Sequence, residues 1–155
     1  MKLSVTINGA AETQDIRPGE LLVQYLRRTG RWSVKRGCED GNCGTCVVEM
    51  DGKAVNSCLM LAAQAEGTEI WTCEGIGNPR APHPVQQAFV DNAAVQCGFC
   101  TPGLIMSTKV LLDHSPRPTD VEIKRALDGN LCRCTGYVKI MDAVHAAIEQ
   151  TEATR

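Results

Sequence analysis

Alternating apolar and polar positions predict five short strands in the first half of the chain. They cover residues 3–7, 12–16, 47–50, 53–56 and 69–72. Asn8-Gly9 and Asp51-Gly52 each separate two of these runs, and such dipeptides readily supply the positive φ angles of a two-residue hairpin turn. The first four strands are therefore expected to form two antiparallel hairpins.

After the first hairpin, the apolar residues recur at the spacing of a helix. One face of the helix predicted there collects the apolar residues Leu21, Leu22, Tyr25 and Leu26. Pro18 suits the first turn of such a helix and Gly30 suits its end, so the helix is expected to run between them. Short strands covered by one helix form an α+β layer arrangement, which is predicted for residues 1–75.

Beyond residue 83, the apolar residues recur only at helical spacing. Residues 76–83 contain one glycine and two prolines and are predicted to be a linker into this second region, residues 84–155. The first helix of the region is expected to begin at Pro84.

Three more helices are predicted from their caps and periods. Thr101 is expected as an N-cap with Pro102 at the first helical position, and Thr119 with Glu122 forms a capping box for the next helix. The last helix carries Ile140, Val144 and Ile148 on one face. Four short helices arranged in two hairpins form a small bundle.

Composition and charge narrow the function classes. The formal charge is −2, with 16 basic and 18 acidic residues spread along the chain, which disfavours a nucleic-acid-binding surface. No run approaches the roughly 18 apolar residues of a membrane span, and the first residues alternate instead of forming an apolar export signal. We therefore expect a cytoplasmic protein without a membrane span.

The nine cysteines are the most informative residues. In a reducing cytoplasm, clustered cysteines hold metal more often than they form disulfides. Cys38, Cys43 and Cys46 have the C-x4-C-x2-C spacing of plant-type 2Fe-2S proteins, which use a distant fourth cysteine.

Cys58 is the predicted fourth ligand. If Asp51-Gly52 is a two-residue turn, Cys46 lies opposite Ser57, which brings Cys58 next to the cysteine loop. Glycines let backbone approach a cluster closely, and this loop contains Gly37, Gly41 and Gly44. A zinc site is the alternative, but zinc favours more closely paired cysteines and has no need of these glycines.

A second set of four cysteines lies in the helical region. Cys97 and Cys100 occupy the predicted turn between its first two helices, and Cys132 and Cys134 lie between the last two. An antiparallel bundle places both turns at one end, and the helix start after Cys100 is expected to lower the pKa of a nearby thiol. The spacing alone is compatible with zinc, a redox thiol pair or an iron–sulfur cluster. Cys73 belongs to neither set and is interpreted as a small buried residue.

Three sequence blocks carry a resemblance to a known family. They are residues 37–46 (GCEDGNCGTC), 96–103 (QCGFCTPG) and 130–137 (NLCRCTGY). In this order they closely resemble the small iron–sulfur subunits of the molybdenum hydroxylases, the xanthine dehydrogenase and aldehyde oxidoreductase family. The resemblance implies an N-terminal β-grasp domain of the plant-type ferredoxin kind and an all-α C-terminal four-helix bundle, each with one 2Fe-2S cluster.

The resemblance also implies partner subunits. A large catalytic subunit would hold a molybdenum-pterin cofactor, and Gln96 and Cys134 match positions that approach this pterin in the family. A subunit that binds FAD, or another acceptor, would take the electrons. The chain itself would contain no catalytic residue and would relay single electrons from molybdenum to the C-terminal cluster and then to the N-terminal cluster.

Two other function classes compete with this interpretation. A stand-alone ferredoxin or redox sensor would not need four more cysteines in a second domain, and a zinc-bearing interaction module would be colourless. Residues 34–38 and 56–67 look more like bacterial xanthine dehydrogenase small subunits than like aldehyde or carbon monoxide enzymes. A purine or another N-heterocycle is therefore the expected substrate of the complex, with an aldehyde or carbon monoxide as the alternative.

Overall fold

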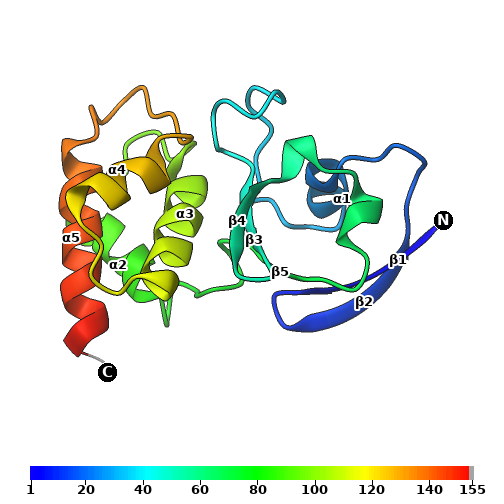
Figure 1. The fold of residues 1–155 in the computed structure, drawn as a ribbon, viewed down its shortest axis with the longest axis horizontal. Coiled ribbons are helices and arrows are strands. Elements are labelled where there is room, and N and C mark those ends of the chain that lie inside the picture. Colours follow the sequence, from blue (N-terminus) through cyan, green and yellow to red (C-terminus); the bar gives the residue numbers. More distant parts are fainter. Residues whose placement is uncertain (154–155) are drawn as a thin grey trace.

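The chain folds into a sheet half and a helical half that lie side by side (Figure 1). The structure is a computed structural model that describes residues 1–153. The strands are β1 (Lys2–Ile7), β2 (Ala10–Asp15), β3 (Val47–Met50), β4 (Lys53–Asn56) and β5 (Glu69–Trp71). The helices are α1 (Leu22–Arg28), α2 (Pro84–Asp91), α3 (Thr101–His114), α4 (Asp120–Leu127) and α5 (Val138–Ala153), and two short 3-10 helices, η1 (Ser57–Leu59) and η2 (Ala62–Ala65), follow β4.

The strands form one mixed sheet in the order β2-β1-β5-β3-β4. β1 and β2 pair antiparallel around Asn8 and Gly9, whose φ angles are 52° and 79°. β3 and β4 pair in the same way around Asp51 and Gly52, at 47° and 76°. Both predicted hairpins are therefore confirmed. β5, also predicted, joins them by pairing parallel to β1 and antiparallel to β3.

The sheet half has its own hydrophobic core between the sheet and α1. Its fully buried side chains include Leu3, Ile7, Leu22, Tyr25, Leu26 and Ile70. Burying one such side chain contributes about 1.5–3 kcal/mol, so this short helix is held by packing more than by its own propensity. The predicted α+β arrangement of this half is confirmed.

The start of α1 differs from the prediction. The helix begins at Leu22 and not near Pro18. Gly19 has a φ of +74°, which is not helical, and Leu21 is extended because it forms an isolated β-bridge with Leu61. A pairing with a distant segment therefore overrides the local helix signal.

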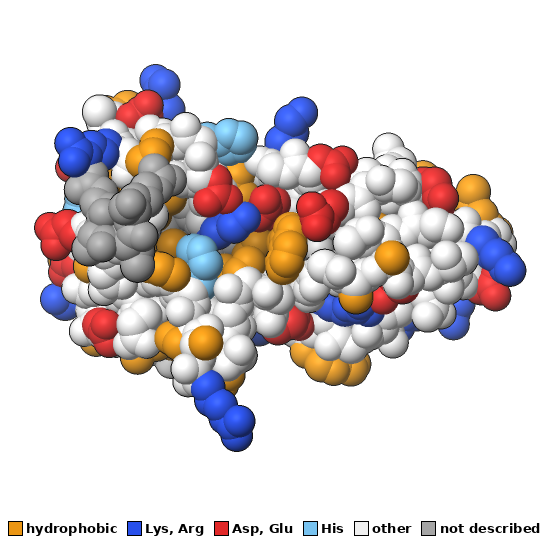
Figure 2. All heavy atoms as spheres, turned by 90° about the horizontal axis from the view of Figure 1, so that it is seen from below, with side chains coloured by type: hydrophobic (Ala, Val, Ile, Leu, Met, Phe, Trp, Pro, Cys, Tyr) orange, Lys and Arg blue, Asp and Glu red, His pale blue; other side chains and the backbone are white. Residues whose placement is uncertain are grey.

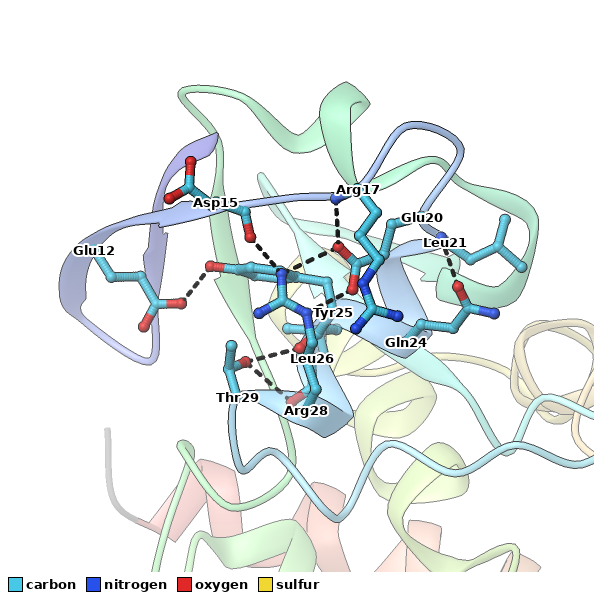
Figure 3. A network of polar contacts seen from close by, with 10 residues as sticks. All are labelled: Glu12, Asp15, Arg17, Glu20, Leu21, Gln24, Tyr25, Leu26, Arg28 and Thr29. Carbon is cyan, nitrogen blue, oxygen red and sulfur yellow. Dashed lines mark hydrogen bonds and ion pairs between the residues drawn. The ribbon is translucent and has the colours of Figure 1, made fainter. Parts of the chain in front are cut away.

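A network of polar contacts stabilises the segment that leads into α1 (Figure 3). The buried carboxylate of Glu20 accepts a hydrogen bond of 2.6 Å from Nε of Arg28, and Nη2 of Arg28 also donates to the Asp15 carbonyl. The Arg28 hydrogen bond holds the pKa of Glu20 below its usual value. Nearby, the Tyr25 hydroxyl donates to Glu12 at 2.6 Å. The loop before the helix is thus tied to both the hairpin and the helix.

A second core fills the helical half. Its fully buried side chains include Val85, Phe89, Leu104, Ile123, Ile140 and Val144. α2 packs against α5 and α3, and α3 also packs against α4. None of the helices within residues 1–153 combines the length and apolar character that a membrane crossing requires.

The helix starts in this half follow the predicted signals with one exception. α2 begins at Pro84, and the capping box of Thr119 and Glu122 precedes α4, as predicted. Thr101, however, is the first residue of α3 and not its cap. Cys100 occupies the cap position, although its φ of −78° and ψ of −19° are right-handed helical values and not the extended values usual for a cap, and its side chain forms no capping hydrogen bond.

The two halves meet where α3 lies against β3. Nζ of Lys109 on α3 bonds to the Glu49 carboxylate of β3 and, at 2.7 Å, to Asp113. His114 adds a 2.6 Å hydrogen bond between its ring Nε2 and the Gly52 carbonyl. Seen from below, acidic, basic and histidine side chains gather over the middle of the molecule (Figure 2). Polar contacts therefore fix the position of one half on the other.

Candidate metal centres

The first cysteine loop runs between α1 and β3 and folds back on its own sulfur atoms. The backbone N–H of Cys38 points at Sγ of Cys43 at 3.4 Å, and the N–H of Cys43 points at Sγ of Cys38 at 3.3 Å. The Thr45 hydroxyl lies 3.3 Å from the same Cys43 sulfur. Donors of this kind favour the thiolate form of a ligand.

Two of the three predicted loop glycines have a left-handed backbone, which glycine adopts without strain. The φ angles of Gly41 and Gly44 are +86° and +69°. Gly37 serves differently, because a Cβ at this position would lie 2.7 Å from Sγ of Cys43. Glycine at this position keeps the backbone close to the sulfur.

Cys46, at the end of this loop, contacts Cys58, which lies in η1. Both are buried, and the Ser57 N–H donates to the Cys46 carbonyl at 3.4 Å, which agrees with the predicted register. Burial, together with contact between the two thiols, raises the pKa of Cys46 to about 12. Cys43 behaves in the opposite way: burial alone would raise its pKa, but hydrogen bonds from Thr45 and Cys38 outweigh burial and lower it to about 7.

The second cysteine set also forms two contacting pairs. The thiols of Cys97 and Cys134 touch at the surface, and those of Cys100 and Cys132 touch below it. The Thr135 hydroxyl donates to Sγ of Cys132 at 3.1 Å. The structure thus brings the two predicted turns together at one end of the helical half.

Tyr137 holds the C-terminal cysteine turn in place. Its hydroxyl accepts the Cys132 N–H at 2.9 Å and donates to the Asn130 carbonyl at 2.9 Å. Tyr137 itself has a φ of +67°, an uncommon value for a bulky side chain. The aromatic residue therefore ties the turn that precedes it to the start of α5, a role that the spacing of the cysteines did not reveal.

The predicted lowering of a thiol pKa near the start of α3 is not found at Cys100. Burial raises the pKa of Cys100 to about 12, and its contact with Cys132 adds to the rise. The pKa of Cys97 is lowered instead, first by the Phe99 backbone N–H and then by the Cys134 thiol. Burial therefore dominates at Cys100, whereas the pKa values of Cys97 and Cys132 are lowered by hydrogen bonds. The pKa of the exposed Cys134 is raised by its contact with Cys97.

The paired arrangement fits a two-iron cluster better than a single ion. Within residues 1–153, no group of three or more cysteine, histidine or acidic side chains is gathered closely enough to hold one metal ion. A 2Fe-2S cluster instead takes two thiolates on each of two irons. Each cysteine set supplies two such pairs, so the donor sets fit this cofactor, and binding it would release protons from the buried thiols.

The two cysteine loops touch each other directly. The Leu131 N–H donates to the Cys43 carbonyl at 2.9 Å, and Nζ of Lys35 donates to the Gly98 and Phe99 carbonyls at 2.8 and 3.2 Å. These contacts could not be predicted from the sequence, because they join residues far apart in the chain.

Three further residues were singled out from the sequence, Gln96, Cys134 and Cys73. Gln96 and Cys134 are both exposed; Cys134 belongs to the surface pair of the second set, and Gln96 directly precedes its other member, Cys97. Cys73 is buried away from both sets, and Nε2 of Gln86 donates to its carbonyl at 2.7 Å. Its interpretation as a small buried residue agrees with this position.

Comparison with known proteins identifies the class of the chain. Residues 5–76 match the 2Fe-2S iron–sulfur cluster binding domain, and residues 72–145 match a further 2Fe-2S binding domain. The chain is therefore an iron–sulfur protein of the 2Fe-2S class.

Individual relatives narrow the class to a family. The nicotinate dehydrogenase small FeS subunit of Eubacterium barkeri is 47% identical, over 96% of this chain and 95% of the relative. The xanthine dehydrogenase iron–sulfur-binding subunit of Escherichia coli O157:H7 is 51% identical, over 92% of this chain and 91% of the relative. The chain belongs to the small iron–sulfur subunits of the molybdenum hydroxylases, and it is the non-catalytic, electron-transferring part of an oxidoreductase.

Solved structures of the same family share the fold. A chain of quinoline 2-oxidoreductase from Pseudomonas putida 86 has a TM-score of 0.93 and 40% identity, covering 99% of this chain and 96% of its own. The aldehyde oxidoreductase of Desulfovibrio desulfuricans ATCC 27774 has a TM-score of 0.95 and 40% identity, covering 99% of this chain but 17% of the larger protein. The arrangement is thus similar to a separate chain in one enzyme and to part of a longer chain in another.

Proposed function

We propose that this subunit takes single electrons from a molybdenum-pterin centre in a large partner subunit and passes them through two 2Fe-2S clusters to an FAD subunit or another acceptor. The observation that carries the proposal is the direct contact between the two cysteine loops. A hydrogen bond links the Cys43 carbonyl to the residue before Cys132, so the two cluster sites are joined by a short stretch of protein.

The cluster ligands follow from the two sets of paired thiols. Cys38 with Cys43 and Cys46 with Cys58 would hold the two irons of the N-terminal cluster. Cys97 with Cys134 and Cys100 with Cys132 would hold those of the C-terminal cluster. When bound, the clusters supply one-electron redox chemistry. The chain supplies their spacing, their hydrogen bonds and their shielding from water.

The direction of transfer is supported by which ligands are exposed. Cys97 and Cys134 of the C-terminal site are exposed, and so is Cys38 of the N-terminal site. Electrons can therefore enter at the exposed pair, which includes the pterin-contact candidate Cys134 and follows the candidate Gln96, and leave near Cys38. This order follows the family resemblance.

We assign the fold of the two halves in the same way. The mixed sheet with α1 supports a β-grasp domain of the plant-type ferredoxin kind, and α2 to α5 support a four-helix bundle. The two separate cores support domains over residues 1–75 and 84–155, with residues 76–83 as the linker. A cytoplasmic location is proposed because reduced thiols are required for cluster assembly.

The substrate of the complex is proposed to be an N-heterocycle. Similar chains are named as subunits of nicotinate, xanthine and caffeine dehydrogenases, and each of the compounds in these names contains a nitrogen heterocycle. Aldehydes are the alternative, because an aldehyde oxidoreductase is also similar.

Anaerobic addition of substrates to the complex from its native host tests the proposal. Nicotinate, xanthine and an aromatic aldehyde are added separately, and samples frozen after short times are examined by EPR. We expect an N-heterocycle to produce signals of reduced 2Fe-2S clusters. Signals with the aldehyde alone would overturn the substrate class. Substrate oxidation without any reduced cluster during turnover would overturn the relay.

A further inference from the structure

Lys35 bridges the two cysteine loops. Its backbone belongs to the first loop, because its N–H donates to the Thr45 carbonyl at 3.0 Å and its carbonyl accepts from the Thr45 hydroxyl at 3.4 Å. Its side chain reaches across to the second loop, where Nζ donates to the Gly98 and Phe99 carbonyls. These two carbonyls lie between Cys97 and Cys100.

The charge of Lys35 has no carboxylate partner. Within the described part of the chain, its ammonium group forms no ion pair, and its contacts are two carbonyls and the Phe99 ring, whose centroid is 5.1 Å away. By contrast, Lys109, which is also partly buried, lies between the carboxylates of Glu49 and Asp113. A full positive charge therefore remains beside the C-terminal cysteine loop.

This position matters for a redox centre. One-electron reduction adds one negative charge to a 2Fe-2S cluster, and the electron comes from the molybdenum centre of the partner. A fixed cation stabilises the added charge, and it does so more strongly where protein replaces water, as at this half-buried side chain.

We propose that Lys35 raises the reduction potential of the C-terminal cluster relative to the N-terminal one. It thereby sets the driving force for electron transfer from the C-terminal to the N-terminal cluster, which becomes smaller as the potential of the C-terminal cluster rises. The inference rests on the proposed function, because it requires both clusters. Lys35 does not touch the redox-active atoms, and it acts as a positioning residue that brings a charge to the loop. The C-terminal cluster is affected more because Nζ bonds within its loop, whereas only the Lys35 backbone contacts the other loop.

Two substitutions separate the charge from the hydrogen bonds. Lys35→Gln keeps an N–H donor and removes the charge, whereas Lys35→Arg keeps the charge. Lys139→Gln is the matched control, since Lys139 is an exposed cation that is paired with Asp142 at 3.1 Å and lies close in sequence to Cys134. All variants are produced as the intact complex, and each cluster is titrated potentiometrically with EPR detection. The signal that Cys100→Ser removes identifies the C-terminal cluster.

We expect Lys35→Gln to shift the potential of the C-terminal cluster to a more negative value, and to shift the N-terminal cluster less. Lys35→Arg and Lys139→Gln should stay close to wild type. An unchanged potential in Lys35→Gln, or an equal shift in Lys139→Gln, would overturn the inference. Loss of the C-terminal cluster from Lys35→Gln would also overturn it, by making Lys35 a structural residue. A wild-type complex with only one 2Fe-2S signal would instead overturn the proposed function itself.

Discussion

Gly44 shows how tightly individual residues are constrained where the two loops meet. A Cβ at this position would lie 2.3 Å from the Gly129 carbonyl oxygen and 2.7 Å from Oδ1 of Asn130. Gly103 faces it in a similar way, since a Cβ there would lie 2.2 Å from the Gly44 carbonyl oxygen. Neither residue can carry a side chain without moving backbone. The glycines are therefore needed for contact between the halves as well as for approach to a cluster.

The substitution Gly44→Ala tests this contact. Gly52→Ala is a matched control, because both glycines have a positive φ but nothing lies within 4 Å of a Cβ at Gly52. We expect Gly44→Ala to lower the free energy of unfolding by about 1–3 kcal/mol more than the control, the usual cost of overpacking. Urea unfolding of both variants measures the difference. Equal losses would show that the loops are not closely packed.

The cysteines themselves provide a second test at the scale of single residues. Cys100→Ser removes a thiolate from the proposed C-terminal cluster, so iron should fall from about four to about two per chain. Cys73→Ala should retain about four, because Cys73 lies in neither set of thiol pairs. Iron analysis of the purified complex distinguishes the two. Equal iron contents in both variants would contradict the ligand assignment.

At the scale of elements, the predictions succeeded where a signal is local. The turn dipeptides Asn8-Gly9 and Asp51-Gly52 require positive φ angles, and the capping box before α4 satisfies its own backbone donors. η1 and η2 were not predicted, because such short turns depend on distant partners. The Ala62 N–H, for example, donates to the Glu20 carbonyl at 2.7 Å. Sequence periodicity carries no information about that pairing.

The contact between α3 and β3 yields a prediction at this scale. Although burial alone would lower it, hydrogen bonds with Asp113 and Glu49 raise the pKa of Lys109, so the cation is stable in this position. In Lys109→Met, the buried Glu49 carboxylate loses its partner. We expect a loss of roughly 3 kcal/mol or more, the cost of leaving a buried charge unpaired.

The exposed pair of Lys139 and Asp142 provides the control for this measurement. Lys139→Met should cost less than about 1 kcal/mol, because water already solvates both groups. Adding Glu49→Gln to Lys109→Met should restore part of the lost stability, since no buried charge then remains. Chemical denaturation of the single and double variants tests this. A double variant less stable than Lys109→Met would contradict the explanation.

At the scale of the whole molecule, the sequence predicted the parts better than their arrangement. The eight predicted ligands fall into two groups of contacting thiols, because each group is formed by residues near turns that were predicted correctly. The contact between the groups could not be predicted. It depends on bonds such as that from Lys35 to Gly98, 63 residues along the chain. Such contacts are set by the packing of one half against the other.

The most direct measurement is iron and acid-labile sulfide per chain in the complex purified from its native host, together with EPR after reduction. We expect about four irons, about four sulfides and two distinct 2Fe-2S signals. About two irons and a single signal, with zinc present in the remaining thiols, would contradict it, because the relay requires a cluster in each half.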